Sequence, residues 1–350
     1  MTEVLRVDPG DPDPDAIARA AACLRGGGLV AFPTETVYGL GVHALDREAV
    51  VRLFAAKARP ANDPLIVHVT TIDALALLVA GVPRDAHALA ARFWPGPLTI
   101  VLRRSRAVPD EVTAGLDTVA VRMPSHPVAR ALIDAARIPI AAPSANLFSR
   151  PSPTDAAHVL ADLDGRIDMV VDGGPAHVGL ESTVVDLSQD PPAVLRPGAV
   201  SLEMLRTVLP NVTVRVSSES DSDALRSPGL MSKHYSPRTP VTLYEGDAAT
   251  ALTAMTREAQ TRVNRGNTVA VLAFAEDAAR LAQLPVRLVQ LGRESDPSEV
   301  AARLYAALRE CDDMGVDVIL CRVLTTHHAL TPAIQDRLLR AAAGRIVQGS

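Results

Sequence analysis

Short apolar segments rich in Val, Ile, Leu and Ala alternate along this chain with longer segments whose apolar residues recur every three or four positions. The first pattern predicts buried β-strands and the second predicts amphipathic helices. In the first part of the chain, strands are predicted at 28–33, 65–69, 98–102, 118–122, 138–142, 169–171, 183–187 and 193–195. Helices are predicted at 46–56, with Asp46 as the N-cap, at 85–93, at 127–136 and from Thr154 onward. This alternation is typical of an α/β fold.

The pattern is interrupted at residues 210–240, which are rich in Pro, Ser and Asp, as linkers are. A second alternation follows, with predicted strands at 241–244, 268–273, 286–291 and 316–320 and predicted helices at 247–263, 297–311 and 332–343. A chain of 350 residues is also long for one hydrophobic core. We therefore predict a first domain at 1–209, a linker at 210–240 and a smaller parallel-sheet domain at 241–350.

Composition and charge argue against several classes of protein. Hydrophobic residues make up 48% and charged residues 21% of the chain, as in ordinary globular proteins. A net charge of −5 and an aromatic content of 3% argue against a general nucleic-acid binder. Cys23, Cys311 and Cys321 are too widely spaced for a cysteine-rich zinc site. The sequence has no signal-peptide pattern and no apolar run of the ~18 residues that span a bilayer, so we expect a cytoplasmic protein without membrane contact.

Lysine is scarce in this chain. Only Lys57 and Lys233 occur among the 35 lysine and arginine residues. Neither follows a glycine, so the chain has no Gly-Lys-Ser/Thr phosphate loop. The sequence also lacks His-Glu-x-x-His and Gly-x-Ser-x-Gly. Lysine offers a compact ammonium suited to a phosphate or a reacting group, so the segments around the two lysines are candidates for function.

Polar clusters interrupt the apolar segments of the first domain, and several come directly after a predicted strand. They comprise 33–41, 57–59 with His68, Arg122, 143–146 with Ser149 and Ser152, 172–175, 181–183 and 196–198. Each alone is explained as well or better by a capped turn, a cation at a helix end or a structural histidine. Together they place four cations beside small hydroxyl side chains near strand ends, where α/β sheets bind ligands. That combination suits a polyphosphate and includes no metal-ligand cluster.

Six motifs, taken in order, resemble those of the threonylcarbamoyl-AMP synthase family, which has a YrdC-like domain. They are FPTETVYGLG at 32–41, KxRP…PLIVH at 57–68, FWPGPLT at 93–99, PSAN at 143–146, EST at 181–183 and LRPG at 195–198. The segment 227–237, followed by a smaller α/β domain, resembles the long, two-domain form. The resemblance implies a YrdC-like twisted mixed sheet with helices, joined by a linker to a smaller Rossmann-like parallel α/β domain.

The resemblance also implies an enzyme, a nucleotidyltransferase that condenses L-threonine, bicarbonate (or CO₂) and ATP to L-threonylcarbamoyladenylate and pyrophosphate. This is the first step of N6-threonylcarbamoyladenosine formation at position 37 of tRNA. ATP would be a substrate, Mg²⁺ would arrive with the nucleotide, and no protein-bound metal is expected. The implied downstream partners are tRNA threonylcarbamoyl-transferase proteins, with room for a weak tRNA contact.

Site residues are carried over from the resemblance, position by position. Those that match threonine-binding positions are Thr36, His68, Arg122, Ser182 and the backbone of Ala142. Those that match nucleotide and phosphate positions are Lys57, Arg59, Thr118, Ser144, Asn146, Ser152 and Arg196, with Tyr235 covering the nucleotide. Lys57 and Arg59 would act in catalysis by stabilising the departing pyrophosphate. Asp63 falls in the same nucleotide segment, where its charge is unfavourable unless it faces Mg²⁺ or solvent.

The expected mechanism depends on positioning and charge neutralisation, and the sequence identifies no general base. The linker, with His234 and Tyr235 flanked by prolines, is a candidate lid. Three other functions stay open. They are an RNA-binding module, a carbamoyltransferase of hydrogenase maturation (whose Cys-x-x-Cys modules are absent here) and a structural protein with an inactive site.

Overall fold

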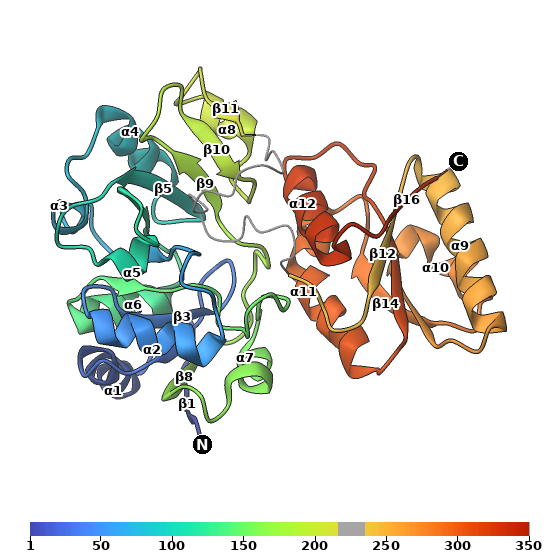
Figure 1. Ribbon diagram of the computed structural model, residues 1–350, viewed down its shortest axis with the longest axis horizontal. Coiled ribbons are helices and arrows are strands. Elements are labelled where there is room, and N and C mark those ends of the chain that lie inside the picture. Colours follow the sequence, from blue (N-terminus) through green and yellow to red (C-terminus); the bar gives the residue numbers. More distant parts are fainter. Residues whose placement is uncertain (216–234, 350) are drawn as a thin grey trace. The chain divides into compact units, whose positions relative to one another are not determined.

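The computed structural model describes residues 1–215 and 235–349, which form two compact units (Figure 1). The first unit consists of Met1–Phe148, Ser152–His177 and the described residues from Glu181 to 215. The second consists of Ser149–Pro151, Val178–Leu180 and the described residues from Tyr235 onward. Most of the predicted linker, including Lys233 and His234, lies outside the described residues. The boundaries at 209 and 241 stay a prediction.

The described part of the first unit contains one mixed sheet. Its 11 strands lie in the order β1 (Glu3–Arg6), β8 (Met169–Asp172), β2 (Val30–Phe32), β3 (Gly39–His43), β7 (Ile140–Ala141), β4 (Ile66–His68), β6 (Thr118–Arg122), β5 (Leu98–Arg103), β9 (Thr183–Asp186), β10 (Ala193–Arg196) and β11 (Thr213–Val214). The central strand β6 runs parallel to β4 and antiparallel to β5. The mixed sheet that the resemblance implied is thus confirmed.

Helices cover the sheet of the first unit unevenly. They are α1 (Pro14–Arg25), α2 (Arg47–Lys57), α3 (Leu75–Leu78), α4 (Arg84–Phe93), α5 (Asp110–Thr113), α6 (Pro127–Ala136), α7 (Ala156–Leu163) and α8 (Leu202–Arg206). The largest core cluster joins residues of α2, α4 and α7 to one face of the sheet. A second cluster joins α1 and α6, which pack against each other, to the other face around β2 and β7 (Figure 1).

A third cluster of the first unit contains strand residues alone: Ile66, Val101, Ala120, Val184 and Leu195. Because side chains alternate along a strand, the residues on either side of Ala120 point to the opposite face, and both belong to the largest core. The same alternation places Thr118 and Arg122 on the face of Ala120. The third cluster is therefore an apolar floor between these two polar residues.

Most sequence-predicted elements are confirmed, because their signals are local. α6 and β6 have the predicted bounds, and Asp46 caps α2 by accepting a hydrogen bond from the Ala49 N–H at 3.1 Å. The N-terminal elements β1 and α1 were not predicted, and β3 lies in a segment interpreted as a polar turn. β3 contains Gly41, where an added Cβ would lie 2.8 Å from the Phe32 ring. Glycine there permits close packing of β3 on β2. Because glycine has no side chain, it also removes the alternation of apolar residues from which a strand is predicted.

The second unit has a parallel sheet, as predicted, with five strands in its described part. Its order is β14 (Arg287–Gly292), β13 (Val269–Phe274), β15 (Val318–Arg322), β12 (Val241–Glu245) and β16 (Ile346–Gln348). The helices are α9 (Ala248–Asn264), the 3₁₀ turn η1 (Ala275–Asp277), α10 (Ala278–Leu281), α11 (Pro297–Asp313) and α12 (Thr331–Ala342). The short elements η1, α10 and β16 were not predicted.

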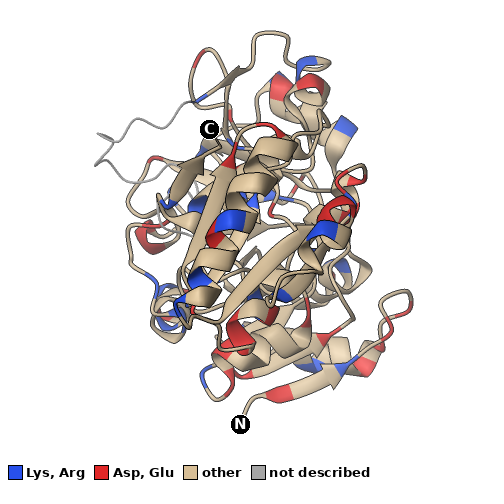
Figure 2. Cartoon of the chain, turned by 90° about the vertical axis from the view of Figure 1, so that its right-hand side faces the viewer, with Lys and Arg blue, Asp and Glu red and all other residues tan. Residues whose placement is uncertain are grey.

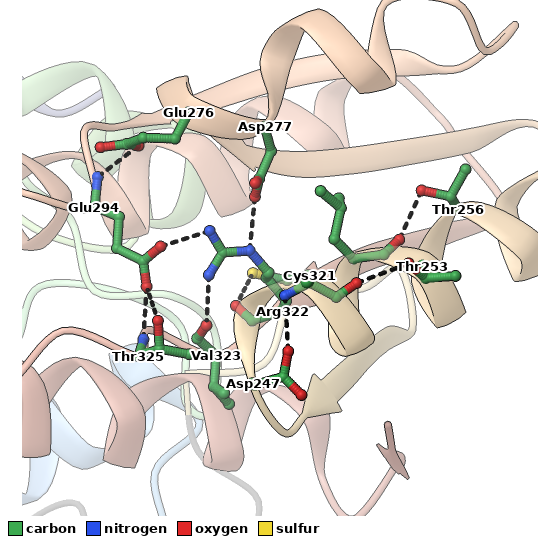
Figure 3. A network of polar contacts seen from close by, with 12 residues as sticks. Asp247, Thr253, Thr256, Glu276, Asp277, Glu294, Cys321, Arg322, Val323 and Thr325 are labelled. Carbon is green, nitrogen blue, oxygen red and sulfur yellow. Dashed lines mark hydrogen bonds and ion pairs between the residues drawn. The ribbon is translucent and has the colours of Figure 1, made fainter. Parts of the chain in front are cut away.

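A buried ion-pair network lies at the carboxyl ends of β13 and β15 (Figure 3). Arg322 contacts Asp277 through Nε at 2.7 Å and Glu294 through Nη2 at 2.6 Å, and its Nη1 donates to the Val323 carbonyl oxygen at 3.1 Å. Glu294 also accepts the Thr325 N–H at 2.6 Å. Strand ends of this kind are where parallel sheets usually bind ligands. Here the guanidinium of Arg322 lies at these strand ends, between Asp277 and Glu294.

Charged residues are mixed along the described chain. Figure 2 shows the positions of Lys and Arg interspersed with those of Asp and Glu along its elements, and the net charge of the chain is −5. None of the helices among the described residues is both long and apolar enough to cross a membrane.

Candidate active site

The predicted site residues of the first unit fall into two groups along the parallel pair β4 and β6. At the carboxyl ends of the pair, His68 lies opposite Arg122. At the other end, Thr118 begins β6, and the segment that carries Arg59 and Asp63 leads into β4. The apolar floor lies between the two groups. The strand pair thus has predicted threonine-binding residues at one end and the segment with a predicted phosphate-binding cation at the other.

Arg122 is buried and forms an ion pair with a residue that the sequence analysis did not assign. Its Nη2 lies 2.7 Å from Glu35 Oε1, and its Nε donates to the Gly96 carbonyl oxygen at 3.4 Å. Glu35 is only 1% exposed, and its Oε2 accepts the Ser125 N–H at 3.1 Å. Burial raises the pKa of Glu35, but the charge of Arg122 and the backbone N–H groups of Glu35 and Ser125 together leave the pKa lowered. Glu35 is therefore an ionised partner of Arg122 at neutral pH.

His68 shares this buried environment and is uncharged at neutral pH. Burial and the neighbouring charge of Arg122 lower its pKa to about 3, although Glu35 opposes the shift. The imidazole packs edge-on against the Phe32 ring, with 6.4 Å between ring centroids. A histidine with so low a pKa is a weak base. The geometry therefore favours a binding role for His68 over proton abstraction.

Hydroxyl groups surround this end of the site. Thr34 donates its proton to the Val37 carbonyl oxygen at 2.6 Å, so in the 2.8 Å contact between the two threonines Thr36 is the donor. Ser182 Oγ lies 2.7 Å from Thr99 Oγ1. The Ala142 N–H donates to the Ile66 carbonyl oxygen at 2.9 Å. A substrate contact from the Ala142 backbone would therefore have to use its carbonyl oxygen.

Lys57, the last residue of α2, is buried against the loop that follows β7. Its Nζ lies 2.5 Å from the carbonyl oxygens of both Ser144 and Asn146. Burial and the charge of Arg59 lower the pKa of Lys57 well below its usual value, and Asp63 and Asp162 oppose that shift. Among the described residues, these two carbonyl oxygens are the acceptors that Lys57 contacts. The structure thus brings together three residues that the sequence predicted for the nucleotide.

Asp63, whose charge is unexpected in this segment, forms an ion pair with Arg59. The Arg59 Nη2 lies 2.9 Å from Asp63 Oδ2 and donates to the Pro64 carbonyl oxygen, also at 2.9 Å. Asp63 is 0% exposed, so it does not face solvent as one sequence-based alternative required. Its charge is offset by the buried guanidinium of Arg59. Asp63 therefore fixes the orientation of Arg59.

The motifs at 152, 181–183 and 196 meet in a further buried cluster. Ser152 Oγ donates to Glu181 Oε1 at 2.5 Å, and Arg196 donates to the carbonyl oxygen of Ser182 through Nε at 3.1 Å. Arg196 Nη2 also reaches Ser182 Oγ at 3.2 Å. Arg196, which was predicted for the nucleotide, thus contacts Ser182, which was predicted for threonine.

Tyr235 belongs to the second unit. Its ring packs against Tyr305, with 5.4 Å between centroids, and the Arg337 guanidinium lies 5.4 Å from its ring centre. Its predicted role over the nucleotide stays a prediction. Among the described residues, no group of three His, Cys, Asp or Glu side chains is placed to hold a metal ion.

Comparison with known proteins identifies the family. A family profile described as "Telomere recombination" matches residues 22–198, and one described as "Threonylcarbamoyl-AMP synthase, C-terminal domain" matches residues 200–343. The threonylcarbamoyl-AMP synthase of Bacillus subtilis (strain 168) is 43% identical over 333 residues, which cover 95% of this chain and 94% of that protein. The chain belongs to the threonylcarbamoyl-AMP synthase family. The resemblance predicted from six motifs is thereby confirmed.

Another member of the threonylcarbamoyl-AMP synthase family, from Pyrococcus abyssi (strain GE5 / Orsay), is 42% identical over 336 residues, covering 94% of each chain. A solved structure, the crystal structure of P. abyssi Sua5 complexed with L-threonine, matches with a TM-score of 0.92 at 41% identity and covers 99% of each chain. The match extends over both units, so the predicted long, two-domain form of the family is confirmed.

Two carboxylates of the site were missed in the sequence. Glu35 and Glu181 both lie within motifs that were recognised, but neither was assigned a role. In each motif a carboxylate adjoins a hydroxyl residue that was assigned, Thr36 and Ser182. The available signal was that an acidic residue within an apolar, strand-flanking motif needs a buried cation or donor.

Proposed function

We propose that this protein condenses L-threonine, bicarbonate and ATP to L-threonylcarbamoyladenylate and pyrophosphate, the first step of N6-threonylcarbamoyladenosine formation in tRNA. The observation that carries the proposal is that predicted site residues lie at both ends of the strand pair β4 and β6. Arg122 and His68 lie at one end of β4 and β6, and Arg59 lies in the segment at the other end. An amino acid and a triphosphate can bind there side by side.

Threonine binds at the end that carries Arg122. Its carboxylate pairs with the guanidinium, which among the described residues has Nη1 without a hydrogen bond or ion pair. Hydroxyl groups of Thr36 and Ser182 and the neutral ring of His68 contact the rest of the amino acid. The crystal structure of the related P. abyssi protein with L-threonine supports this choice of substrate.

The nucleotide binds at the cationic end. Lys57 and Arg59 contact the phosphates, and Arg196 lies close enough to Ser182 to join the two substrates. The remaining nucleotide contacts come from Thr118, Ser144, Asn146, Ser152 and Tyr235. Asp63 acts through Arg59. Mg²⁺ accompanies the nucleotide and offsets its charge.

The chemistry needs little covalent participation by the protein. The neutral amine of threonine attacks CO₂, with release of one amine proton to solvent, or attacks bicarbonate, with loss of water; either route gives a carbamate. A carbamate oxygen then attacks the α-phosphorus of ATP, and pyrophosphate leaves. Charge accumulates on the departing pyrophosphate, where Lys57 and Arg59 stabilise it. The low pKa of His68 argues against its use as the general base.

The test is pyrophosphate release from ATP by the purified full-length protein. Release should require both L-threonine and bicarbonate, and mass spectrometry should detect the threonylcarbamoyl adenylate. Release without threonine, or no release at all, would contradict the proposal. Tight tRNA binding without any nucleotide turnover would instead favour an RNA-binding module.

A further inference from the structure

Glu35 places a buried negative charge against the cation proposed to receive the carboxylate of the substrate. The two groups are 2.7 Å apart, and both side chains are at most 5% exposed. Such a pair is costly to bury unless its geometry has a use. Arg122 is also fixed by the Gly96 carbonyl oxygen, and Glu35 by the Ser125 N–H. The guanidinium is therefore held in one orientation, in which Nη1 has no hydrogen bond or ion pair among the described residues.

The charges of the pair itself cancel at neutral pH. Arg122 is positive and Glu35 negative, while burial and the charge of Arg122 keep His68 neutral. His126, the N-cap of α6, also lies near Glu35, and burial lowers its pKa. A site built from a paired cation and carboxylate complements a zwitterion, which presents one carboxylate and one ammonium close together.

We propose that Glu35 is a positioning and specificity residue, which orients Arg122 through Nη2 and makes the pocket prefer an amino acid in its zwitterionic form over the same molecule without the amine. The inference rests on the proposed function in taking L-threonine as the ligand. It assigns no contact between Glu35 and the reacting atoms.

The preference has an electrostatic cause. An amine-free carboxylate brings one uncompensated negative charge close to Glu35, in a region where water screens weakly. The ammonium of threonine offsets that repulsion. Replacing Glu35 by Gln keeps the size of the side chain and removes its charge, so the pocket becomes positive. The monoanion then binds better relative to threonine, whereas loss of packing alone would weaken both ligands together.

The experiment compares equilibrium binding of L-threonine and (R)-3-hydroxybutyrate, its amine-free counterpart, to the full-length protein. The variants are Glu35→Gln and Glu35→Asp. Glu111→Gln is the control, because Glu111 pairs with the exposed Arg47. We expect the wild-type protein, Glu35→Asp and the control to prefer threonine. In Glu35→Gln the ratio of the two dissociation constants should fall by about tenfold or more.

An unchanged ratio in Glu35→Gln would overturn the proposal. Equal affinity of the wild-type protein for the two ligands would overturn it without any variant, should Glu35→Gln fail to fold. Pyrophosphate release separates this inference from the proposed function. A shifted ratio in a protein that releases no pyrophosphate sinks only the proposed reaction, and normal release with an unchanged ratio sinks only the role of Glu35.

Discussion

The Nζ of Lys57 lies 2.5 Å from the carbonyl oxygen of Ser144, so a residue at the end of α2 is tied to the loop after β7. The same ammonium contacts the Asn146 carbonyl oxygen. Lys57 thus shapes the loop that carries two predicted nucleotide contacts, and we propose that it also contacts the phosphates of the nucleotide.

Lys57→Ala should reduce kcat for pyrophosphate release by at least about a hundredfold, because charge on the leaving group loses a fixed cation. It should also destabilise the fold by about 1–3 kcal/mol, since two buried carbonyl oxygens lose their donor. Steady-state kinetics and urea unfolding measure the two effects. Retention of wild-type turnover would refute the catalytic role of Lys57.

Asp63→Ala should lower the free energy of unfolding by about 3–5 kcal/mol, because it leaves the Arg59 guanidinium buried without its carboxylate. Glu111→Ala is the matched control, since Arg47, its partner, has a side chain that is 73% exposed. The control should change stability by at most about 1 kcal/mol. Equal effects of the two substitutions in urea unfolding would show that burial of the Arg59–Asp63 pair has no energetic consequence.

His68 should make stability depend on pH below neutrality. Its pKa is about 3 in the folded protein and about 6.5 when unfolded, so between these values the unfolded chain binds one more proton. Stability therefore rises with pH across that window and is lost as pH falls, by up to about 1.4 kcal/mol per pH unit. Urea unfolding of wild-type protein and His68→Gln between pH 5 and 7 measures the difference in slope. Identical slopes would contradict the buried, neutral state of His68.

Arg322→Met should destabilise the second unit by about 3–5 kcal/mol, because Asp277 and Glu294 would remain buried without their shared cation. Adding Asp277→Asn and Glu294→Gln to this variant should restore part of that loss, because the uncompensated charges disappear. Arg293→Ala is the control, since the Arg293 side chain is 64% exposed. Thermal unfolding distinguishes these outcomes. A triple variant less stable than Arg322→Met would argue against charge repulsion as the cause.

The sequence predicted the helices and strands that carry the site residues better than it predicted the contacts between those residues. Helix α2 was predicted from its cap and its apolar spacing, and the motif that contains Arg122 was correctly placed at the end of a strand. The ion pair of Arg59 with Asp63 was missed, although the two residues are only four positions apart. The segment after Lys57 leaves the helix at Ala58, whose φ is 50°, so helical spacing does not describe it.

The sequence alone determined the α/β class, most strands and helices and the family, because periodicity, caps and motifs are properties of neighbouring residues. Only the tertiary structure decided that Glu35 pairs with Arg122, that Lys57 holds the loop at Ser144, and that Arg322 fills the strand ends of the second sheet. These contacts join residues far apart in the chain. They depend on which strands become neighbours and in what register, and no local pattern of residues specifies that order.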